Sequence, residues 1–456
     1  MQPYTDTLTA ACGLADPNAV WGMTQAASEL VRSLHHLGVQ FNVTDDDELD
    51  LRNFGGQKKK RTAFAQSDTG KQLMTALIDA VRREESAGTV ERFPHHKFRT
   101  LLLSGNICGG CTVQDTYTGE LLRFVCDAVL IATGGLHGLF GDTTGSLANT
   151  GEVTAELFRL GVPMANLEMI QYHPTTVELG EKRMLLSEAA RGEGGRLFAL
   201  RNGKPWYFME EKYPELGNLM PRDITAREVW TVSRDYEVFL DMTELPKEVM
   251  EHKLAGLVDD CQTYLHKDIR KEPIPILPGI HYFMGGIQVD ERHRTSMRNL
   301  YAAGECCAQY HGANRLGGNS LLGAIYGGQI AAETACRETV SSPNMPCAEE
   351  SLLPELSPDA QMQMNRILLN ALGVVRDAQT LEAGIQEIRK LSGTLPLLGC
   401  AMLESGLARK ESRGAHWRAD YPQRNDAVYC KTTVAHWNGQ HIAISFESIP
   451  ERRHDL

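Results

Sequence analysis

The chain has 456 residues, of which 42% are hydrophobic and 23% charged, and its formal net charge is −12. A chain of this length exceeds what one hydrophobic core serves, so we expect two or three domains. The negative charge argues against a nucleic-acid backbone as the main partner, and the sequence has no apolar run near the roughly 18 residues that cross a bilayer.

The first residues, MQPYTDTLTAACGLADP, contain neither a basic flank nor an apolar signal core. A secretory signal needs both. We therefore expect a cytoplasmic protein, or one held at the inner face of a membrane through partner subunits.

The sequence has eleven cysteines, an odd number scattered without a repeating pattern, which predicts reduced thiols rather than a disulfide framework. Cys108 and Cys111 form a lone CxxC between strand-like segments, and no second pair follows at metal spacing. We interpret these cysteines as packing residues and predict no metal site.

The first predicted elements are helices. Apolar residues recur at helical spacing in 17–37 and 71–84, and Asp68-Thr69-Gly70 precedes the second segment as a cap. Two strand-like segments follow in LLLSGNICGGCTVQDTYTGELLRF and predict a hairpin. The next run, Asp127 to Ala132, is continuously apolar and ends in Thr133-Gly134-Gly135, which predicts a buried strand whose end approaches a ligand.

The texture of the sequence changes between residues 167 and 280, where loops bounded by Pro and charged helices predict a second domain. Strand-like patterning returns at 286–303, so we expect the first domain to be interrupted by the second. Residues 362–391 predict two amphipathic helices, and the segment from Thr432 to Glu447 alternates like a strand.

Five short stretches combine a cationic or imidazole side chain with Gly or Pro, which restrict the backbone. They are QYHPT (171–175), SEAARGEGG (187–195), PRD (221–223), HYFMGG (281–286) and HGANR (311–315). One such His or Arg is usually structural, and HGANRLGG alone also fits a tight turn with an exposed cation. Convergence of the stretches would suit a small dianion, because Arg forks and imidazole donors bind carboxylates. The residues concerned are His173, His281, Arg222 and Arg315.

Nearly the whole chain carries short motifs in a consistent order: ATGG, NTGE, QYHPT, SEAARGEGG, PRD, HYFMGGI, NLYAAGE, HGANRLGGNSL and RKESRGAHWRADYP. Together they resemble the flavoprotein subunits of succinate dehydrogenase and fumarate reductase, a family that also includes L-aspartate oxidase. The resemblance implies an α/β fold with an α+β cap. A discontinuous FAD-binding domain, of Rossmann-like or glutathione-reductase type, would comprise residues 1–166 and 281–345. A capping domain would span 167–280, and a C-terminal helical domain with a terminal strand would span 350–456.

The resemblance also implies which residues bind the substrate. His281 and Arg315 would bind one end of it, while His173 and Ser187 would hold the other carboxylate. Ser187 stands where the family frequently has Thr, and this replacement keeps the hydroxyl.

By the same resemblance, Arg222 would donate a proton to the substrate carbon. Because a guanidinium normally stays protonated in proteins, this role requires a relay that refills it at once. Glu188 and Arg191 would form that relay.

The cofactor that the resemblance implies is FAD. Glu305 would meet its ribose, and the helix start at Ser320 and Leu321 would face the electron-rich edge of the flavin. The full set of expected cofactor-binding residues is Thr133, Gly134, Gly135, Glu152, Gly304, Glu305, Asn319, Ser320 and Leu321.

The implied reaction interconverts fumarate and succinate by hydride transfer at the flavin and proton transfer from Arg222. Aspartate oxidases typically carry a Glu where this chain has Phe54, and an apolar ring cannot neutralise a substrate ammonium, so we favour a dicarboxylate without an amine. Two alternatives stay open. One is an L-aspartate oxidase-like enzyme, and the other is a cofactor-less protein that binds dicarboxylates or a partner without catalysis.

The sequence shows no iron–sulfur cysteine spacing. We therefore expect electrons to be exchanged with an iron–sulfur or other electron-transfer subunit, with a free flavin or haem donor, or with oxygen. Neither a nucleic acid nor a direct membrane span is expected.

One unit of the family pattern is absent. Family members begin with a strand and a GxGxxG turn that seats the FAD pyrophosphate on backbone N–H groups, whereas only three residues precede the first match at Tyr4. Three interpretations stay open: a truncated start, a split protein whose missing piece is a second chain, or a relative that no longer binds FAD. A smaller departure is Glu152-Val153, where the family usually has Asp-Gly.

Overall fold

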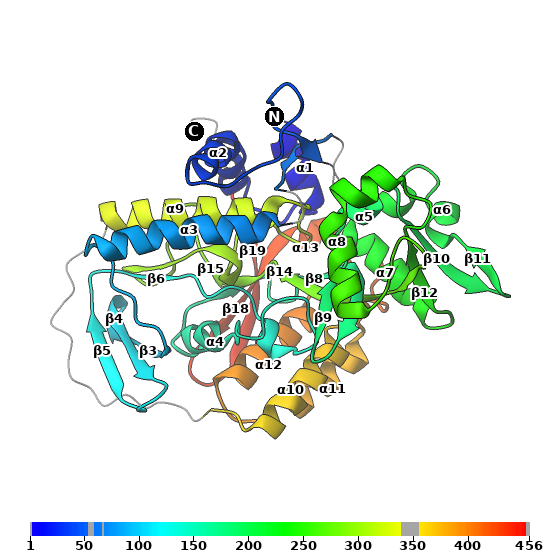
Figure 1. Cartoon of the computed structure of the whole chain (residues 1–456). Coiled ribbons are helices and arrows are strands. Elements are labelled where there is room, and N and C mark those ends of the chain that lie inside the picture. Colours follow the sequence, from blue (N-terminus) through cyan, green and yellow to red (C-terminus); the bar gives the residue numbers. More distant parts are fainter. Residues whose placement is uncertain (1, 53–58, 66–67, 339–354, 453–456) are drawn as a thin grey trace.

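The computed structural model describes residues 2–52, 59–65, 68–338 and 355–452. In Figure 1, helices α3 (Thr69–Ser86) and α9 (Asn319–Glu338) lie side by side on one side of the central strands, and the C-terminal helices lie on the opposite side. The chain segment coloured green forms a separate lobe, which we call the cap.

Three helices and a short hairpin make up the N-terminal layer. They are α1 (Gln2–Ala10), α2 (Pro17–His36), α3 and the antiparallel pair β1 (Leu51–Arg52) and β2 (Thr62–Ala63). Both predicted helices are confirmed. α2 begins at Pro17 because the Asp16 carboxylate accepts two backbone N–H bonds of the first turn. The predicted cap of α3 is wrong in detail, because the Asp68 side chain makes no capping bond; Thr69 Oγ1 instead accepts the backbone N–H of Ala65 at 3.0 Å.

The strand-like segments around the CxxC form an antiparallel sheet of order β3-β4-β5. Its strands are β3 (His96–Ser104), β4 (Ile107–Asp115) and β5 (Leu121–Val125). The predicted hairpin is confirmed, and β5 adds a third strand. Cys108 is buried in the main core, and burial raises the pKa of its thiol to about 11. Across the described residues, no group of His, Cys, Asp and Glu side chains could hold a metal ion.

The strand predicted before the Thr133-Gly134-Gly135 turn is β6 (Val129–Ile131), which pairs in parallel with β16 (Leu300–Ala302). Its predicted burial is wrong, because the Leu130 side chain is 41% exposed. In the part of the chain that the structure describes, β6 and β16 form a two-stranded sheet, so no further strand covers the other edge of β6.

A five-stranded sheet joins segments that are far apart in the sequence. Its order is β17-β15-β7-β18-β19, and its strands are β7 (Met164–Ala165), β15 (Gly286–Gln288), β17 (Cys307–Ala308), β18 (Lys431–Trp437) and β19 (Ile442–Ser448). β15 and β17 are parallel, and the other pairs are antiparallel. The alternating segment near the C-terminus is therefore a hairpin of two strands rather than one.

The sheet of order β14-β8-β9 carries two of the five sequence motifs. It consists of β8 (Ile170–Leu179), β9 (Lys182–Leu185) and β14 (Leu277–Phe283), all antiparallel. The motif QYHPT lies on β8, and HYFMGG begins on β14. Register shifts in the β14–β8 pair bring Gly279 opposite His173 and Tyr282 opposite Gln171.

The cap has a sheet of order β11-β10-β12-β13 and four helices. These elements are β10 (Arg196–Arg201), β11 (Lys204–Trp206), β12 (Val238–Asp241), β13 (Ile274–Pro275), α5 (Ala189–Gly192), α6 (Phe208–Lys212), α7 (Arg222–Ser233) and α8 (Ala255–Asp260). They enclose a hydrophobic cluster of their own, whose buried members run from Leu186 to Ile276. This cluster lies inside the range 167–280, while the domain bounds themselves stay a prediction.

Three helices of the C-terminal region pack against the main core, where they share one hydrophobic cluster with α4 (Glu152–Arg159). These are α10 (Pro358–Ala371), α11 (Ala378–Ile388) and α12 (Thr394–Ala408), and a short helix α13 (Asp426–Tyr429) precedes β18. The two amphipathic helices predicted in 362–391 are confirmed as α10 and α11. Short 3-10 turns occur at His137–Leu139, Gly217–Leu219 and Gly304–Cys306, and π turns at Val249–Lys253 and Cys261–Leu265.

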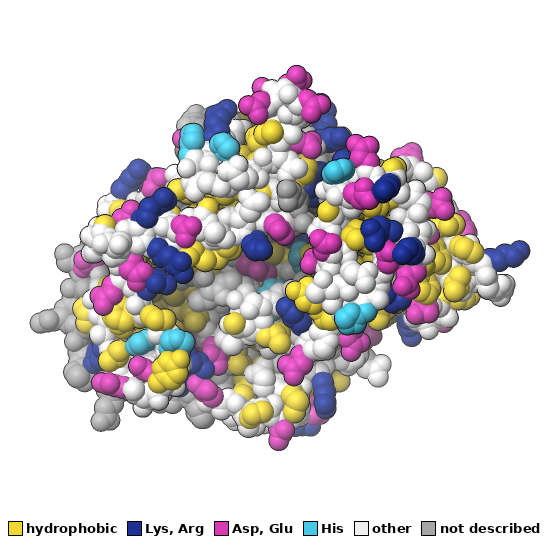
Figure 2. Space-filling model, in the orientation of Figure 1, with side chains coloured by type: hydrophobic (Ala, Val, Ile, Leu, Met, Phe, Trp, Pro, Cys, Tyr) yellow, Lys and Arg dark blue, Asp and Glu magenta, His cyan; other side chains and the backbone are white. Residues whose placement is uncertain are grey.

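Among the described helices, none combines the length and the apolar character that crossing a bilayer requires. On the face shown in Figure 2, acidic and basic side chains are interspersed with hydrophobic ones. Among the described residues on this face, Lys and Arg side chains are dispersed rather than gathered in one patch.

Candidate active site

Side chains from four of the five sequence motifs line one cavity of about 760 Å³. The cavity is bounded by the N-terminal layer, by α8 of the cap and by the start of α9. Its volume lies in the range of sites for small ligands and cofactors. The predicted site residues on its wall are Ser187, Arg222, His281, Arg315, Asn319, Ser320 and Leu321.

Arg222 is the first residue of α7 and is held by a buried carboxylate. Its Nη2 donates to Oε2 of Glu188 at 2.6 Å and its Nε to the same oxygen at 3.0 Å. The other oxygen of Glu188 accepts from Nη2 of Arg191 at 3.1 Å. The structure thus brings together the three residues of the expected proton relay, with Arg222 on the cavity wall and the other two buried behind it.

The charges of this group do not cancel. Burial would raise the pKa of the Glu188 carboxyl, but the guanidinium groups of Arg222 and Arg191 outweigh burial and hold that pKa below its usual range. Burial, followed by repulsion from Arg222, lowers the pKa of Arg315 to about 9, so the positive charge of Arg315 is less favoured here than in water. An anion in the cavity would relieve this excess of positive charge.

The two predicted histidines lie against each other, with ring centroids 5.3 Å apart and ring planes at 70°. His281 lines the cavity, whereas His173 is fully buried and is not part of the cavity wall. Burial, and then Arg222, lower the pKa of both rings well below the usual range of histidine. Both imidazoles are therefore neutral near pH 7, and Nε2 of His173 has no hydrogen-bond partner in the described structure.

Arg315 lies on the loop before α9 and stacks on an aromatic ring. Its guanidinium carbon lies 4.4 Å from the ring centroid of Tyr282, so the face of this ring stabilises the cation by a cation–π contact. The Nε of Arg315 is buried without a hydrogen-bond partner in the described structure. The side chain is thus positioned by packing, and its donors are free to meet a carboxylate.

The sequence did not single out Gln171, which connects the two arginines of the site. Its Oε1 accepts from Nη1 of Arg222 at 3.1 Å, and its Nε2 donates to the backbone oxygen of Arg315 at 2.8 Å. The same Nε2 donates to Oδ1 of Asn314, whose Nδ2 donates in turn to Oδ1 of Asp223. The sequence does contain a signal for Gln171. Residues two apart on a strand face the same side, so Gln171 is expected on the same face as His173.

The glycine-rich turn after β6 meets the loop that carries Glu305. A Cβ built on Gly135 would lie 2.6 Å from Oε1 of Glu305, so any larger residue here would displace the Glu305 carboxylate. The same oxygen accepts the backbone N–H of Phe283 at 3.0 Å. Gly134, Gly135, Gly304 and Glu305 are therefore brought together, and Thr133 lies exposed at the end of β6.

Glu152 is not brought to this cluster, contrary to expectation. Its Oε1 pairs with Nζ of Lys97 at 2.9 Å, and it lines a small surface pocket with Lys97 and Glu355. The side chain at the start of α4 thus faces the β3–β4–β5 sheet. The family usually has Asp at this position, and the longer side chain of Glu152 reaches Lys97.

The motif RKESRGAHWRADYP supports the site from behind, as a structural turn. Its arginines are buried: Arg409 and Arg413 both bond Glu411, and Arg409 also bonds Glu168 at 2.7 Å. The backbone N–H of Ala415 donates to the carbonyl of Ala313 at 2.8 Å, within the HGANR stretch. This contact holds the loop that carries Arg315.

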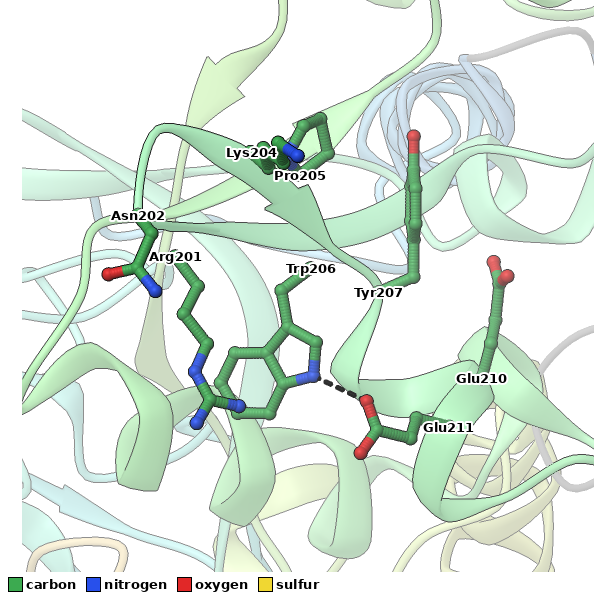
Figure 3. A pocket seen from close by; sticks show the side chains of 8 residues that line it. All are labelled: Arg201, Asn202, Lys204, Pro205, Trp206, Tyr207, Glu210 and Glu211. Atoms are coloured by element: carbon green, nitrogen blue, oxygen red, sulfur yellow. Dashed lines mark hydrogen bonds between the residues drawn. The ribbon is translucent and has the colours of Figure 1, made fainter.

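A second pocket, of about 580 Å³, lies on the outer edge of the cap (Figure 3). There, Nε1 of Trp206 donates to Oε2 of Glu211 at 2.7 Å, and Arg201 lies beside the same ring. None of the predicted site residues lines this pocket. The stretch with Phe54 and the segment 339–354, which includes part of the predicted range 281–345, lie outside the described residues.

Comparison with known proteins decides the family. A model of the FAD binding domain matches residues 1–321, and a model of the fumarate reductase flavoprotein C-terminus matches residues 392–453. The chain is 36% identical over 499 residues to the succinate dehydrogenase flavoprotein subunit of Bacillus subtilis (strain 168), covering 97% of this chain and 85% of that one. The chain belongs to the flavoprotein-subunit family of succinate dehydrogenase and fumarate reductase.

Two further members show the breadth of this family. The L-aspartate oxidase of Streptomyces coelicolor is 30% identical over 498 residues, covering 99% of this chain and 84% of that one. Among solved structures, the FrdA chain of E. coli quinol fumarate reductase matches with a TM-score of 0.88 and 25% identity, covering 98% of this chain and 86% of that chain. The predicted fold class is confirmed, and FAD is the cofactor of this flavoprotein family.

The residues present fit the flavin end of FAD. The turn at Gly135 lies directly against Glu305, the residue expected at the ribose, and Leu321, in the first turn of α9, lies 42% exposed on the cavity wall. Asn319 and Ser320 place the helix start at the same wall, where backbone N–H groups favour electron-rich atoms. Among the described residues, no strand is followed by a GxGxxG turn and a helix, the arrangement that seats a pyrophosphate on backbone N–H groups.

Proposed function

We propose that this flavoprotein interconverts fumarate and succinate. The observation that carries the proposal is the buried Glu188 carboxylate that holds Arg222 at the cavity wall. An arginine fixed in this way is a directed donor with a charged partner behind it. A binding protein has no need of such a relay, whereas proton transfer to a substrate carbon requires one.

The substrate would be bound as a dianion between the two sides of the cavity. His281 and Arg315 meet one carboxylate, and Ser187 meets the other. We assign His173 to the same carboxylate as Ser187, and its buried Nε2, which has no hydrogen-bond partner in the described structure, supports this role. With both ends fixed, the two central carbons lie in a constant orientation to Arg222, which lowers the entropic part of the barrier.

When bound along the start of α9, FAD would supply the hydride chemistry at one central carbon. Arg222 gives the proton to the other carbon in reduction and takes it back in oxidation. Its guanidinium does not stay deprotonated, because Glu188 returns a proton from Arg191. The cations on the wall stabilise negative charge that develops on the dicarboxylate.

The electrons would leave or arrive through an iron–sulfur or other electron-transfer subunit. The sequence shows no iron–sulfur cysteine spacing, and the relatives from B. subtilis and E. coli are named a flavoprotein subunit and a quinol fumarate reductase. Such a partner would also hold the protein at the inner face of a membrane. On the basis of the family resemblance, we also propose four domain ranges: 1–166, 167–280, 281–345 and 350–456.

The first experiment is the visible absorption spectrum of the purified chain after incubation with excess FAD and removal of free cofactor. We expect flavin bands that stay with the protein and bleach on addition of succinate. L-Aspartate serves as the comparison substrate. Bleaching by L-aspartate and not by succinate would overturn the proposal, as would a flavin-loaded protein that succinate leaves oxidised.

A further inference from the structure

A turn of the FAD-binding region reaches across to one of the substrate histidines. The backbone N–H of Thr144 donates to the carbonyl of Ile280 at 2.9 Å, and Oγ1 of Thr144 lies 2.8 Å from Nδ1 of His281. Thr143, the residue before it, is held by strand β9, because the backbone N–H of Arg183 donates to the carbonyl of Thr143 at 2.9 Å. Thr144 itself is not on the cavity wall, so it reaches a ligand only through His281.

A neutral imidazole carries a single N–H, and its position decides what the ring can bind. With the proton on Nδ1, the lone pair of Nε2 faces the ligand and repels a carboxylate. With the proton on Nε2, the ring donates to a carboxylate without carrying a charge. Because Nδ1 of His281 is taken by Thr144, Nε2 is the nitrogen left for a ligand in the cavity.

We propose that Thr144 is a positioning residue, whose hydroxyl donates to Nδ1 of His281 and so keeps the Nε2–H of this ring available to a substrate carboxylate. The proposal rests on the proposed function, since it assigns His281 to a dicarboxylate. It adds a residue that none of the five motifs contains. The role is to set the tautomer and the ring orientation rather than to touch the substrate.

The competing acceptor for the Thr144 hydroxyl is weaker than Nδ1. It is the carbonyl of Ile280, which lies 3.3 Å from Oγ1 and already accepts the backbone N–H of Thr144. The 2.8 Å contact with Nδ1 is close to the ideal for a hydroxyl donor. A bound carboxylate favours Nε2–H further, because only that tautomer gives it a donor.

The charged surroundings of the ring explain why a neutral donor is needed. Arg222 and Arg315 lie close enough to His281 to oppose a third positive charge, and the neighbouring His173 is packed edge-on against it. A ring that cannot become imidazolium before substrate binds must offer its one N–H in the correct direction. A hydroxyl can donate or accept, so Thr144 allows this without adding a charge.

The neighbouring threonine separates this role from general packing. Oγ1 of Thr143 lies 3.2 Å from Nδ1 of His137, whose Nε2 lies 3.5 Å from Oε1 of Glu305. Two consecutive hydroxyls thus serve two different histidines, one on the substrate side and one on the side expected to bind the ribose of FAD. The effect of removing the Thr144 hydroxyl should be confined to the substrate side.

The test compares Thr144→Val, Thr144→Ser and the control Thr334→Val, all as FAD-loaded full-length chains. Thr334 is a buried threonine of α9 whose hydroxyl bonds only the carbonyl of Ile330 in its own helix. The probe is malonate, a dicarboxylate with a single central carbon and hence no central C–C bond to oxidise or reduce, and its affinity is measured by calorimetry. We expect Thr144→Val to raise the Kd about tenfold, the value for one hydrogen bond to a charged ligand, and Thr144→Ser to restore it.

A second measurement reads the tautomer directly. In protein labelled with ¹⁵N-histidine and saturated with malonate, the Nδ1 signal of His281, assigned by its loss in His281→Gln, should be that of an unprotonated nitrogen. In Thr144→Val the fraction of this tautomer should fall. Unchanged malonate affinity or an Nδ1-protonated ring in the wild-type complex would overturn the role of Thr144. If instead wild-type protein binds malonate normally but succinate never bleaches the flavin, the proposed function fails while the tautomer assignment stands.

Discussion

Glu188 accepts two hydrogen bonds from Arg222 on a single carboxylate oxygen, at 2.6 Å from Nη2 and 3.0 Å from Nε. Arg222 is only 8% exposed and Glu188 only 3%. The pair is therefore a charge-assisted contact inside the protein, stronger and more directional than a surface ion pair. It fixes which nitrogens of Arg222 are left for the cavity.

Replacing Arg222 by Ala removes the expected proton donor. We predict that kcat for fumarate reduction falls by about 10³ or more, the usual contribution of a positioned acid. The Kd for malonate should change less than about threefold, because His281 and Arg315 still provide donors. Stopped-flow flavin reoxidation measures the first quantity and calorimetry the second.

The matched control for Arg222 is Arg227→Ala on the same helix. The guanidinium of Arg227 stacks on Trp417 with its carbon 3.9 Å from the ring centroid, away from the cavity. This variant should keep kcat near the wild-type value. Comparable activity in Arg222→Ala and Arg227→Ala would remove Arg222 from the mechanism.

Replacing Gln171 by Leu keeps a branched side chain of similar volume but removes the amide that joins Arg222 to the backbone of Arg315. We predict a fall in kcat of roughly tenfold to a hundredfold, because a donor displaced by a fraction of an ångström loses much of its rate. The redox spectrum of the bound flavin should not change. Gln361→Leu, on α10, is the control, and an equal loss in both variants would point to stability rather than positioning.

The pH dependence of stability should carry the signature of His311. Burial, followed by Arg315, lowers the pKa of this ring to about 3, whereas an unfolded histidine titrates near 6.5. A lowered folded pKa means that the unfolded state binds the proton first. The stabilisation is therefore complete above about pH 6.5 and is lost as the pH falls from there toward 3.

Urea denaturation between pH 7.5 and 5 checks this expectation. The free energy of unfolding should fall by up to about 1.4 kcal/mol per pH unit for this one group once the pH is below 6.5. In His311→Gln the same plot should be shallower by that amount. Parallel curves for the two proteins would show that His311 does not titrate differently in the folded and unfolded states.

Replacing Gly414 by Ala should weaken dicarboxylate binding from a distance. Gly414 has φ +53°, and an added Cβ would lie 2.5 Å from the carbonyl oxygen of Ala313, in the stretch that carries Arg315. The loop must shift, and we predict a rise in the malonate Kd of about tenfold, with a loss of stability of about 1–3 kcal/mol.

Gly439→Ala separates backbone strain from the contact. Gly439 has φ +93° in the turn between β18 and β19, and a Cβ there would meet nothing within 4 Å. This variant should lose stability through strain alone and keep its affinity for malonate. If both variants lose affinity alike, the contact between Gly414 and Ala313 does not position the loop.

The sequence predicted the elements whose signals are local. The helices at Pro17–His36 and Thr69–Ser86 follow from periodic apolar residues, and α2 also from its cap. The motifs identified Arg222, His281 and Arg315 because Gly and Pro around a charged residue restrict its backbone. Resemblance then supplied the family, which the comparisons confirm.

The features that the sequence does not predict depend on contacts between residues far apart in the chain. Leu130 was expected to be buried, yet burial of a strand depends on what covers its edges and faces. Glu152 was expected at the cofactor, but its carboxylate reaches Lys97 on another sheet. Gln171 and Thr144 were overlooked because an amide or a hydroxyl gains its role only from the partner that folding brings to it.

The active site draws on turns, strands and helices of both the FAD-binding region and the cap, from Thr144 to Arg315. Contacts of such large sequence separation form late in folding, because the loop-closure entropy must first be overcome. A partly folded chain therefore has no partial site to offer. During refolding, affinity for a dicarboxylate should appear only in the slowest phase, so a bound dianion stabilises the finished molecule and gives no assistance to its intermediates.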